Sequence, residues 1–371
     1  MKKSRTILYS AISLAVLTGL AIYALVFYIP GATDVDVQIA EKLVTPDAGT
    51  EASSLYDELR SIYGRKIISG QQTWAFSQAK GGFEDEVILQ KTGKLPYLNG
   101  FDFLLYTAYD DASQIDAAIS WHRDRGGIVA FCWHWLVPGQ DGGLTYEGSK
   151  SDFDITQAII KDTDENARLM KDLKKTADGL EMLRQAGVPV LWRPMHEADL
   201  DYFWWSKGGP AVYVKLWDIM FHYFVDERGL DNLIWVWNGQ SKAWLVPSDQ
   251  YDIASMDVYP RSKIDRSSHA RLFRKCQAMA PTKMVALSEC EFIPEPDQLV
   301  KDKAKWLWYM SWHTSYVYVP NSETDILPAR PFMLNEKYIN EADLKRIMDN
   351  DYVLTLPSTQ TEHDQGSQTG Q

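Results

Sequence analysis

The segment LWRPMHEADLDYFWW (191–205) places an arginine, a histidine and a glutamate directly after an apolar run, and Glu289 ends a second run, KMVALSE (283–289). Two carboxyl groups that face each other can cleave a glycosidic bond. One protonates the leaving oxygen, and the other attacks the anomeric carbon or activates a water. Glu197 and Glu289 are therefore the first candidates for chemistry. A single glutamate at a strand end is more often a surface residue paired with a cation, so the pair needs support from the fold.

Eight short runs of the β-strand type alternate with helical or crossover segments. The runs are residues 65–70, 95–103, 126–135, 188–197, 232–238, 251–260, 283–289 and 305–312. Several are continuously apolar, as expected for parallel strands that are covered on both faces. Helical periodicity is clear in 111–126 and in 163–187, which ends at Gly187. The pattern predicts an α/β protein with a (β/α)8 barrel. The alternative is a doubly wound open sheet, but no glycine-rich phosphate loop follows the first run.

In such a barrel the active groups gather where the strands end. The ends of the eight runs carry polar or aromatic side chains: Gln71, Gln72, Trp74, Asp102, Trp133, His134, Arg193, His196, Glu197, Trp237, Asn238, Asp257, Tyr259, Glu289 and Trp312. Their convergence on one rim favours a catalytic site over a structural one. The fourth and seventh runs lie on facing parts of an eight-stranded ring, so Glu197 and Glu289 can approach each other across its mouth.

Three further side chains near the predicted acids carry charge or can carry it. Arg193 lies in a strand and must hydrogen-bond a carboxylate, either as a structural pair or to orient a catalytic acid. His134 and His196 are expected to bind sugar hydroxyls or to tune a glutamate. A zinc-protease pattern would need a second histidine four positions after His196, where Leu200 stands, so no metal site is expected.

Composition narrows the class of ligand. Aromatic residues make up 12% of the chain, and Trp74, Tyr202, Trp204, Trp205 and Trp312 either cap the core or stack on sugars. The formal net charge of −12 would repel a polyanion, so nucleic acid is not an expected partner and a neutral or cationic substrate is. The three cysteines are too few and too scattered for a disulfide scaffold.

The N-terminus begins with MKKSR, and residues 6–29 then run without a charge. An apolar stretch of about 20 residues can cross a bilayer, so residues 1–30 are predicted to be a transmembrane signal-anchor with the catalytic body outside the cytoplasm. A cleaved signal peptide is the alternative. Residues 31–54 are expected to be a linker, residues 55–355 a single catalytic domain, and residues 356–371 a disordered tail.

The motifs WRPMHE, DYFWW, DNLIWVWNGQ, MDVYP and ALSEC resemble glycoside hydrolase family 26, from about Arg65 to Trp312. That family is typified by endo-β-1,4-mannanases, and rarer members act on mixed-linked β-glucan or β-1,3-xylan. The resemblance implies a (β/α)8 barrel and retention of anomeric configuration without a cofactor. It makes Glu197, in the matching WRPMHE, the general acid/base, and Glu289, in ALSEC, the nucleophile.

The resemblance also implies sugar contacts at His134, His196, Tyr259 and Trp312. From their places on the rim or beside the acid, Tyr202, Trp205, Trp74 and Asp102 are added as expected substrate contacts. The expected substrate is a β-mannan or a related hemicellulose, and a monomer is expected. Three alternatives stay open: a member that acts on another β-glycan, a transglycosylase, and a non-catalytic carbohydrate-binding relative.

Overall fold

The structure is a computed structural model that describes residues 38–73, 83–139, 145–260, 264–312, 316–318, 326–328 and 338–357. Eight parallel strands form a closed barrel, because the last of them pairs back onto the first. In ring order they are β1 (Ile67–Gln72), β3 (Leu98–Asp102), β4 (Ile128–Cys132), β5 (Val190–Arg193), β6 (Leu233–Trp237), β7 (Ile253–Val258), β8 (Met284–Cys290) and β9 (Trp308–Ser311). The predicted (β/α)8 barrel is confirmed, and each of the eight predicted runs overlaps one of these strands, with β1 and β8 extending one or two residues beyond their runs.

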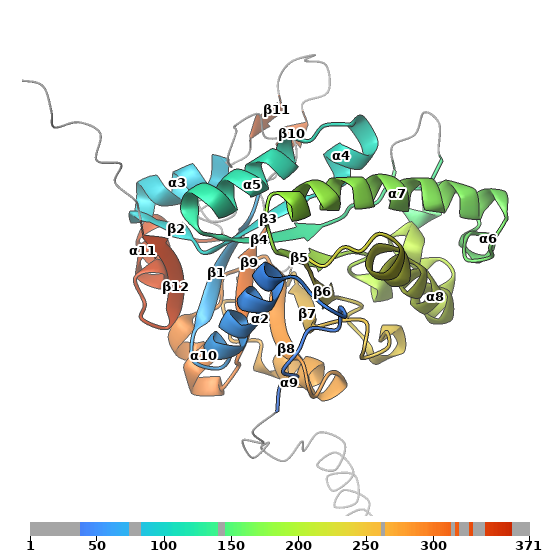
Figure 1. The fold of residues 1–371 in the computed structure, drawn as a ribbon. Coiled ribbons are helices and arrows are strands. Elements are labelled where there is room, and N and C mark those ends of the chain that lie inside the picture. The colour runs from blue at the N-terminus through green and yellow to red at the C-terminus, as the bar shows by residue number, and fades with distance from the viewer. Residues whose placement is uncertain are drawn as a thin grey trace, which may run out of the picture. The chain divides into compact units, whose positions relative to one another are not determined.

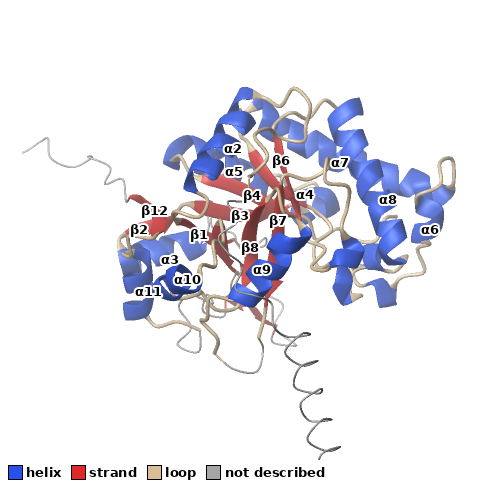
Figure 2. Cartoon of the chain, turned by 90° about the horizontal axis from the view of Figure 1, so that it is seen from below, coloured by secondary structure: helices blue, strands red, loops and turns tan. Residues whose placement is uncertain are grey.

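Helices cover the outside of the barrel (Figures 1 and 2). They are α3 (Phe83–Thr92), α4 (Leu104–Tyr109), α5 (Ser113–Arg125), α6 (Ile155–Ala158), α7 (Asp164–Gln185), α8 (Gly209–His222), α9 (Ala270–Met279), α10 (Pro296–Asp302) and α11 (Glu341–Met348). The helix α7 begins where Thr163 accepts a hydrogen bond from the Asn166 amide, and it ends just before Gly187 at φ 71°. Between β6 and β7 the chain forms only a short 3₁₀ turn, Lys242–Trp244, so the alternation of strands and helices is incomplete there.

The strands separate two layers of core because successive side chains point to opposite faces. In β5, Val190 and Trp192 pack outward against the helices, whereas Leu191 packs inside the barrel. The other strands, and the residue just before β9, also contribute apolar side chains to this inner layer. They include Ile68, Leu98, Ile128, Ile234, Ile253, Met284 and Leu307. Arg193 shares the inward face with Leu191, which brings a charge to the mouth of the barrel.

The expected linker 31–54 is wrong in its second half, because residues 38–49 and helix α2 (Thr50–Ile62) pack across the N-terminal end of the barrel. The amides of Ala40, Val44 and Gly49 donate to Thr282 O (3.0 Å), Asp252 Oδ1 (2.7 Å) and Asp231 O (2.8 Å). Each acceptor residue lies one or two positions before a barrel strand. The buried side chains of α2, Ala52, Leu55, Tyr56 and Leu59, join the inner core and close this end.

The C-terminal segment adds strand β12 (Val353–Pro357), which lies parallel to β1. It also pairs in antiparallel fashion with β2 (Lys94–Pro96), outside the barrel. The strand extends two residues past the predicted domain end at 355. A separate antiparallel pair is formed by β10 (Tyr316–Tyr318) and β11 (Ile326–Pro328).

The predicted transmembrane segment, residues 1–30, lies outside the residues that the structure describes, as does most of the predicted tail. Among the described residues, no helix combines the length and apolar character needed to cross a bilayer.

Candidate active site

Arg193, the last residue of β5, lies between two carboxylates at the mouth of the barrel. Its guanidinium donates to Asp257 Oδ2 on β7 (3.0 Å) and to Glu289 Oε1 on β8. The Tyr259 hydroxyl donates to the other oxygen of Glu289, Oε2, at 2.7 Å. Arg193 and Glu289 are only 6% and 4% exposed. Both oxygens of Glu289 are thus held in fixed positions by charged and neutral hydrogen-bond donors.

Glu197 reaches the same place from the loop that follows β5. One carboxylate oxygen from each of Glu197, Asp257 and Glu289 lies within 4.8 Å of the others. The two acids singled out from the sequence therefore meet, although they come from strands on different sides of the ring. Glu197 is the less buried of the pair, so it borders the solvent while Glu289 forms the floor.

An irregularity in the pairing of β7 with β8 aims Glu289 at this site. Met256 is opposite Leu287, but the next residue, Asp257, is opposite Glu289, so Ser288 is the extra residue of a bulge. A β-bulge re-aims the side chains that follow it. Here it brings the Glu289 and Asp257 carboxylates together around Arg193.

The backbone that presents Glu197 is held in an uncommon conformation. Met195 and Glu197 have φ values of 46° and 51°, in the left-handed region that side chains with a Cβ disfavour. The Tyr213 hydroxyl donates to Met195 O (3.2 Å), and the Glu197 amide donates to Asn238 O (2.8 Å). Such strain persists only where the surroundings enforce it, and it is concentrated at functional sites.

Asn238 and Asp257 have a larger part in the site than their places in the sequence indicated. Asn238 Nδ2 donates to Asp257 Oδ1 (2.9 Å) and to Ser255 Oγ (3.0 Å), and Gln240 Oε1 accepts from the Asp257 amide (3.1 Å). Burial raises the pKa of Asp257 well above its ordinary value, the charge of Glu289 raises it further, and Arg193 opposes both. The motifs WNGQ and MDVYP contain these residues, but residue type alone does not reveal which side chain each one contacts.

Two groups of described residues bring possible metal-ligand atoms together. In the Glu197–Asp257–Glu289 group, the Arg193 guanidinium supplies the positive charge. Burial would lower the pKa of Arg193, but the charges of Asp257 and Glu289 raise it above the ordinary value, so the cation is permanent. Two of the three carboxylates, those of Asp257 and Glu289, are paired with this cation.

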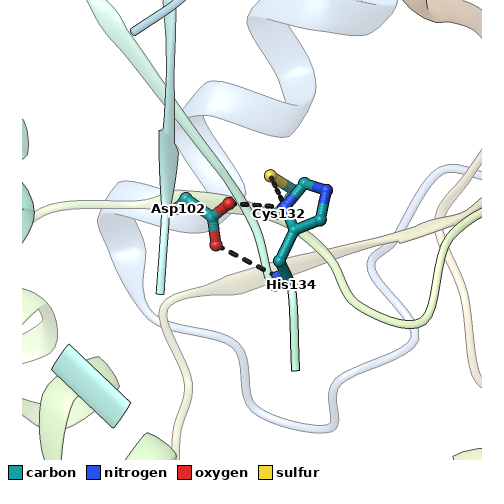
Figure 3. Close-up of side chains that lie close together, drawn as sticks. All are labelled: Asp102, Cys132 and His134. Carbon is teal, nitrogen blue, oxygen red and sulfur yellow. Dashed lines mark hydrogen bonds and ion pairs between the residues drawn. The ribbon is translucent and has the colours of Figure 1, made fainter. Parts of the chain in front are cut away.

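In the second group, Asp102 Oδ2 and His134 Nδ1 are hydrogen-bonded to each other at 2.5 Å (Figure 3). The third member, Cys132, donates to the Phe101 carbonyl oxygen (3.5 Å), and burial raises the pKa of its thiol. The Asp102 and His134 side chains are therefore partners of each other, and Cys132 has a backbone partner outside the group.

Asp102 was predicted to contact substrate, and in the structure both of its oxygens already have partners within the protein. Its Oδ1 accepts from the amides of Leu104 (2.9 Å) and His134 (3.1 Å), and its Oδ2 accepts from the His134 ring. Because both oxygens are engaged and the residue is 6% exposed, Asp102 serves the site through His134. The His134 ring in turn lies 4.8 Å, between centroids, from the ring of the buried His196.

The predicted aromatic contacts divide by exposure. Tyr202 is 45% exposed, and Trp312 is partly buried with its ring 5.9 Å from that of His134. Trp205 is fully buried and stacks on Phe203 at 4.2 Å between centroids. Of these three described side chains, Tyr202 and Trp312 have surface to offer a ligand, and Trp205 has none.

The prediction that Trp205 contacts substrate is therefore corrected to a supporting role. Its Nε1 donates to the carbonyl oxygen of His196 at 3.0 Å and so fixes the residue before Glu197. Trp74, also predicted as a contact, lies outside the described residues.

Comparison with known proteins places this arrangement in a family. Residues 44–336 match the profile of glycosyl hydrolase family 26, and this range includes α2 and all eight barrel strands. The chain belongs to family 26. Curated family relatives include a mannan endo-1,4-β-mannosidase of Thermothelomyces thermophilus, 34% identical over 89% of this chain and 66% of its own length. Another is mannan endo-1,4-β-mannosidase A of Piromyces sp, 31% identical over 88% of this chain and 52% of its own. The chain thus spans about half to two-thirds of the length of these relatives.

Solved structures of family 26 mannanases share the fold. The β-(1,4)-mannanase of Podospora anserina superposes with a TM-score of 0.76 at 33% identity, covering 89% of this chain and 71% of that one. A β-mannanase from a symbiotic protist of the termite Reticulitermes speratus, solved with a gluco-manno-oligosaccharide, gives 0.74 at 32% identity and covers 86% and 97%.

Proposed function

We propose that this chain is a retaining endo-glycoside hydrolase that cleaves β-mannosidic bonds in mannan-type hemicellulose. The observation that carries the proposal is the approach of the Glu197 and Glu289 carboxylate oxygens to within 4.8 Å. Retaining glycosidases hold their two carboxyl groups about 5–5.5 Å apart, whereas inverting enzymes leave about 6.5–9.5 Å for a water. The short separation supports direct attack by one carboxylate on the sugar.

In the first step, a Glu289 oxygen bonds to the anomeric carbon as the bond from that carbon to the leaving oxygen breaks. Glu197 gives its proton to the leaving oxygen. In the second step, a water oxygen bonds to the anomeric carbon, its proton passes to Glu197, and the bond to Glu289 breaks. Arg193 and Tyr259 hold the two oxygens of Glu289 in place for attack and stabilise it as a leaving carboxylate.

The substrate class rests on three supports. The named family relatives act on mannan, the net charge of −12 favours an uncharged polymer, and the exposed Tyr202 offers a flat surface to a sugar ring. His134, His196, Tyr259 and Trp312 are assigned to sugar contacts next to the scissile bond.

The test is a panel of β-mannan, mixed-linked β-glucan and β-1,3-xylan, with released reducing sugar measured and the anomeric configuration of the first product followed by NMR. We expect mannan to be cleaved with retention. Preference for another polymer would replace the substrate, and an inverted product would overturn the mechanism. Longer products at high acceptor concentration would identify a transglycosylase, and no release from any polymer would favour a binding protein.

The export of the catalytic domain also belongs to the proposal, and it rests on the positive flank and uncharged stretch of residues 1–30. Mass spectrometry of the mature N-terminus distinguishes a retained anchor from a cleaved signal peptide. Size-exclusion chromatography with light scattering tests the expected monomer.

A further inference from the structure

Two histidine rings lie side by side in the site, and their surroundings differ. The centroids of His134 and His196 are 4.8 Å apart, with the rings nearly perpendicular. His134 Nδ1 is bonded to the Asp102 carboxylate, whereas His196 Nδ1 is buried without a hydrogen-bond partner among the described residues. Two adjacent imidazoles cannot both be charged at low cost, because like charges at this distance repel. Among the described residues, a carboxylate is hydrogen-bonded to the ring of His134 and none to the Nδ1 of His196.

We propose that Asp102 is a positioning residue that places the positive charge of this pair on His134 and keeps His196 neutral. The inference rests on the proposed function and deepens it. It gives Asp102 a role in charge distribution, in place of the substrate contact that the sequence suggested.

The geometry of Asp102 suits this role. Oδ1 is fixed by the amides of Leu104 and His134, which leaves Oδ2 aimed at the His134 ring (Figure 3). The ring is thereby held with Nδ1 toward Asp102 and Nε2 on the side turned away from that carboxylate. When the ring is protonated, Nε2–H is a donor available to a sugar hydroxyl.

The charges around the pair act in the same direction. Titratable groups from several strands and loops face His134: Asp102, Cys132, Tyr146, Arg193, His196 and Glu289. Burial lowers the pKa of His134, but Asp102, by charge and hydrogen bond, and Glu289, by charge, raise it above the ordinary value. Burial lowers the pKa of His196 well below that value, and the charges of Arg193 and His134 lower it further.

Positive charge is therefore placed on the His134 side of the site and kept away from His196. A cation at His134 faces the negative charge of Glu289, so it accompanies Arg193 in balancing the acids on the floor. Neutral His196 adds no positive charge next to Glu197 in the chain. A general acid must keep its proton until the bond breaks, and a neighbouring cation would favour its early loss.

The first arm of the test is a titration of the two rings by NMR with ¹³C-labelled histidine, with His134→Ala and His196→Ala to assign the signals. Asp102→Asn keeps an oxygen for the backbone amides but removes the charge. We expect it to lower the pKa of His134 by about one unit or more and to raise that of His196. Unchanged titration of both rings would overturn the proposal. This readout needs no turnover, so it stands even where the mannanase proposal fails.

The second arm is a double-mutant cycle on mannan. Alone, Asp102→Asn should lower kcat/KM about tenfold and move the alkaline limb of the pH profile to lower pH. In a His134→Ala background it should change kcat/KM less than about twofold, since its effect passes through His134. An equal loss in both backgrounds would contradict the proposal, because Asp102 would then act on the fold or on the sugar itself.

A matched control for both arms is Asp172→Asn. Asp172 lies on α7 and accepts a hydrogen bond from Trp135 Nε1 (2.9 Å), so this variant removes a partly buried carboxylate charge near the His134 strand without touching the Asp102–His134 bond. The control should leave both histidine titrations in place.

Discussion

The two ends of the barrel differ in polarity: the N-terminal end is apolar, and the C-terminal end carries charged side chains. At the N-terminal end, α2 inserts Ala52, Leu55 and Leu59 into an apolar interior, and backbone amides of residues 40–49 bond to the residues just before three strands. At the C-terminal end, Arg193 and its carboxylates occupy the corresponding inward positions. The same closed barrel therefore serves stability at one end and chemistry at the other. The apolar N-terminal end stabilises the fold, and the charged side chains at the C-terminal end can vary with the reaction.

The largest effect that tests this division is expected for Glu289→Ala. Loss of the nucleophile should lower kcat on mannan by about a thousandfold or more, because no covalent intermediate can form. The melting temperature should change little, since the apolar end is untouched. Steady-state kinetics and thermal melting check both halves, and near-normal kcat would remove Glu289 from its assigned role.

Glu197→Ala should have the next largest effect, and the effect should depend on the leaving group. On mannan, kcat/KM should fall by about 10²- to 10⁴-fold, because the leaving alkoxide then departs without a proton. An aryl mannoside with an acidic phenol needs no such help, so its first step should be affected far less. Equal losses on both substrates would argue against the acid role.

At the other end of the barrel, Leu59→Ala should act on stability alone. The fully buried leucine leaves a cavity, at a cost of about 2–5 kcal/mol in unfolding free energy. The exposed Ser54→Ala on the same helix is the control. Denaturant unfolding measures the loss, while kcat per folded molecule should match the parent enzyme. A large fall in kcat at full folding would show that the two ends are coupled.

The smallest effect is expected at Asp252, whose oxygens accept from the amides of Val44 (2.7 Å) and Trp235 (2.8 Å). Burial raises its pKa to about 7, whereas the two amides and Lys283 oppose that shift. The folded state therefore binds this proton more tightly than the unfolded chain does. The group favours folding below about pH 4, and that contribution is lost as the pH rises to about 7.

Asp252→Asn should therefore flatten the dependence of unfolding free energy on pH across this window, although it removes one of the two hydrogen bonds because the amide NH2 group cannot accept. Denaturant unfolding at several pH values measures the slope. The exposed Asp249→Asn is the control and should keep the parent slope. An unchanged slope in Asp252→Asn would mean that this carboxyl does not take up a proton in the folded state.

The sequence predicted the barrel because several of its strands are continuously apolar and separated by helical or crossover segments, and it predicted that Glu197 and Glu289 could meet because both stand at the ends of such apolar runs. It could not predict the Arg193–Asp257–Asn238 network, since those contacts depend on the bulge at Ser288 and on the register of β7 against β8. Because residues 38–54 are largely polar, they were predicted to belong to a linker, and the start of α2 was missed. The buried side chains of this helix are spaced along one face.

Exposure was the other quantity that residue type did not reveal. Trp205 and Tyr202 stand close together in one aromatic segment, yet the first is fully buried and the second is 45% exposed. Asp102 looked like a sugar ligand at a strand end, but the backbone turn after β3 and the His134 ring use both of its oxygens. Such pairings emerge only when loops from different strands meet.

In the proposed mechanism, Glu289 attacks the anomeric carbon of the sugar and Glu197 delivers the proton to the leaving oxygen. The most direct test of this mechanism is trapping with a 2-deoxy-2-fluoro-β-mannoside that carries an activated leaving group, followed by peptide mass spectrometry. We expect one covalently bound fluorosugar on the peptide that contains Glu289, and no label in Glu289→Ala. A label on another residue, or an inverted product without any label, would contradict it.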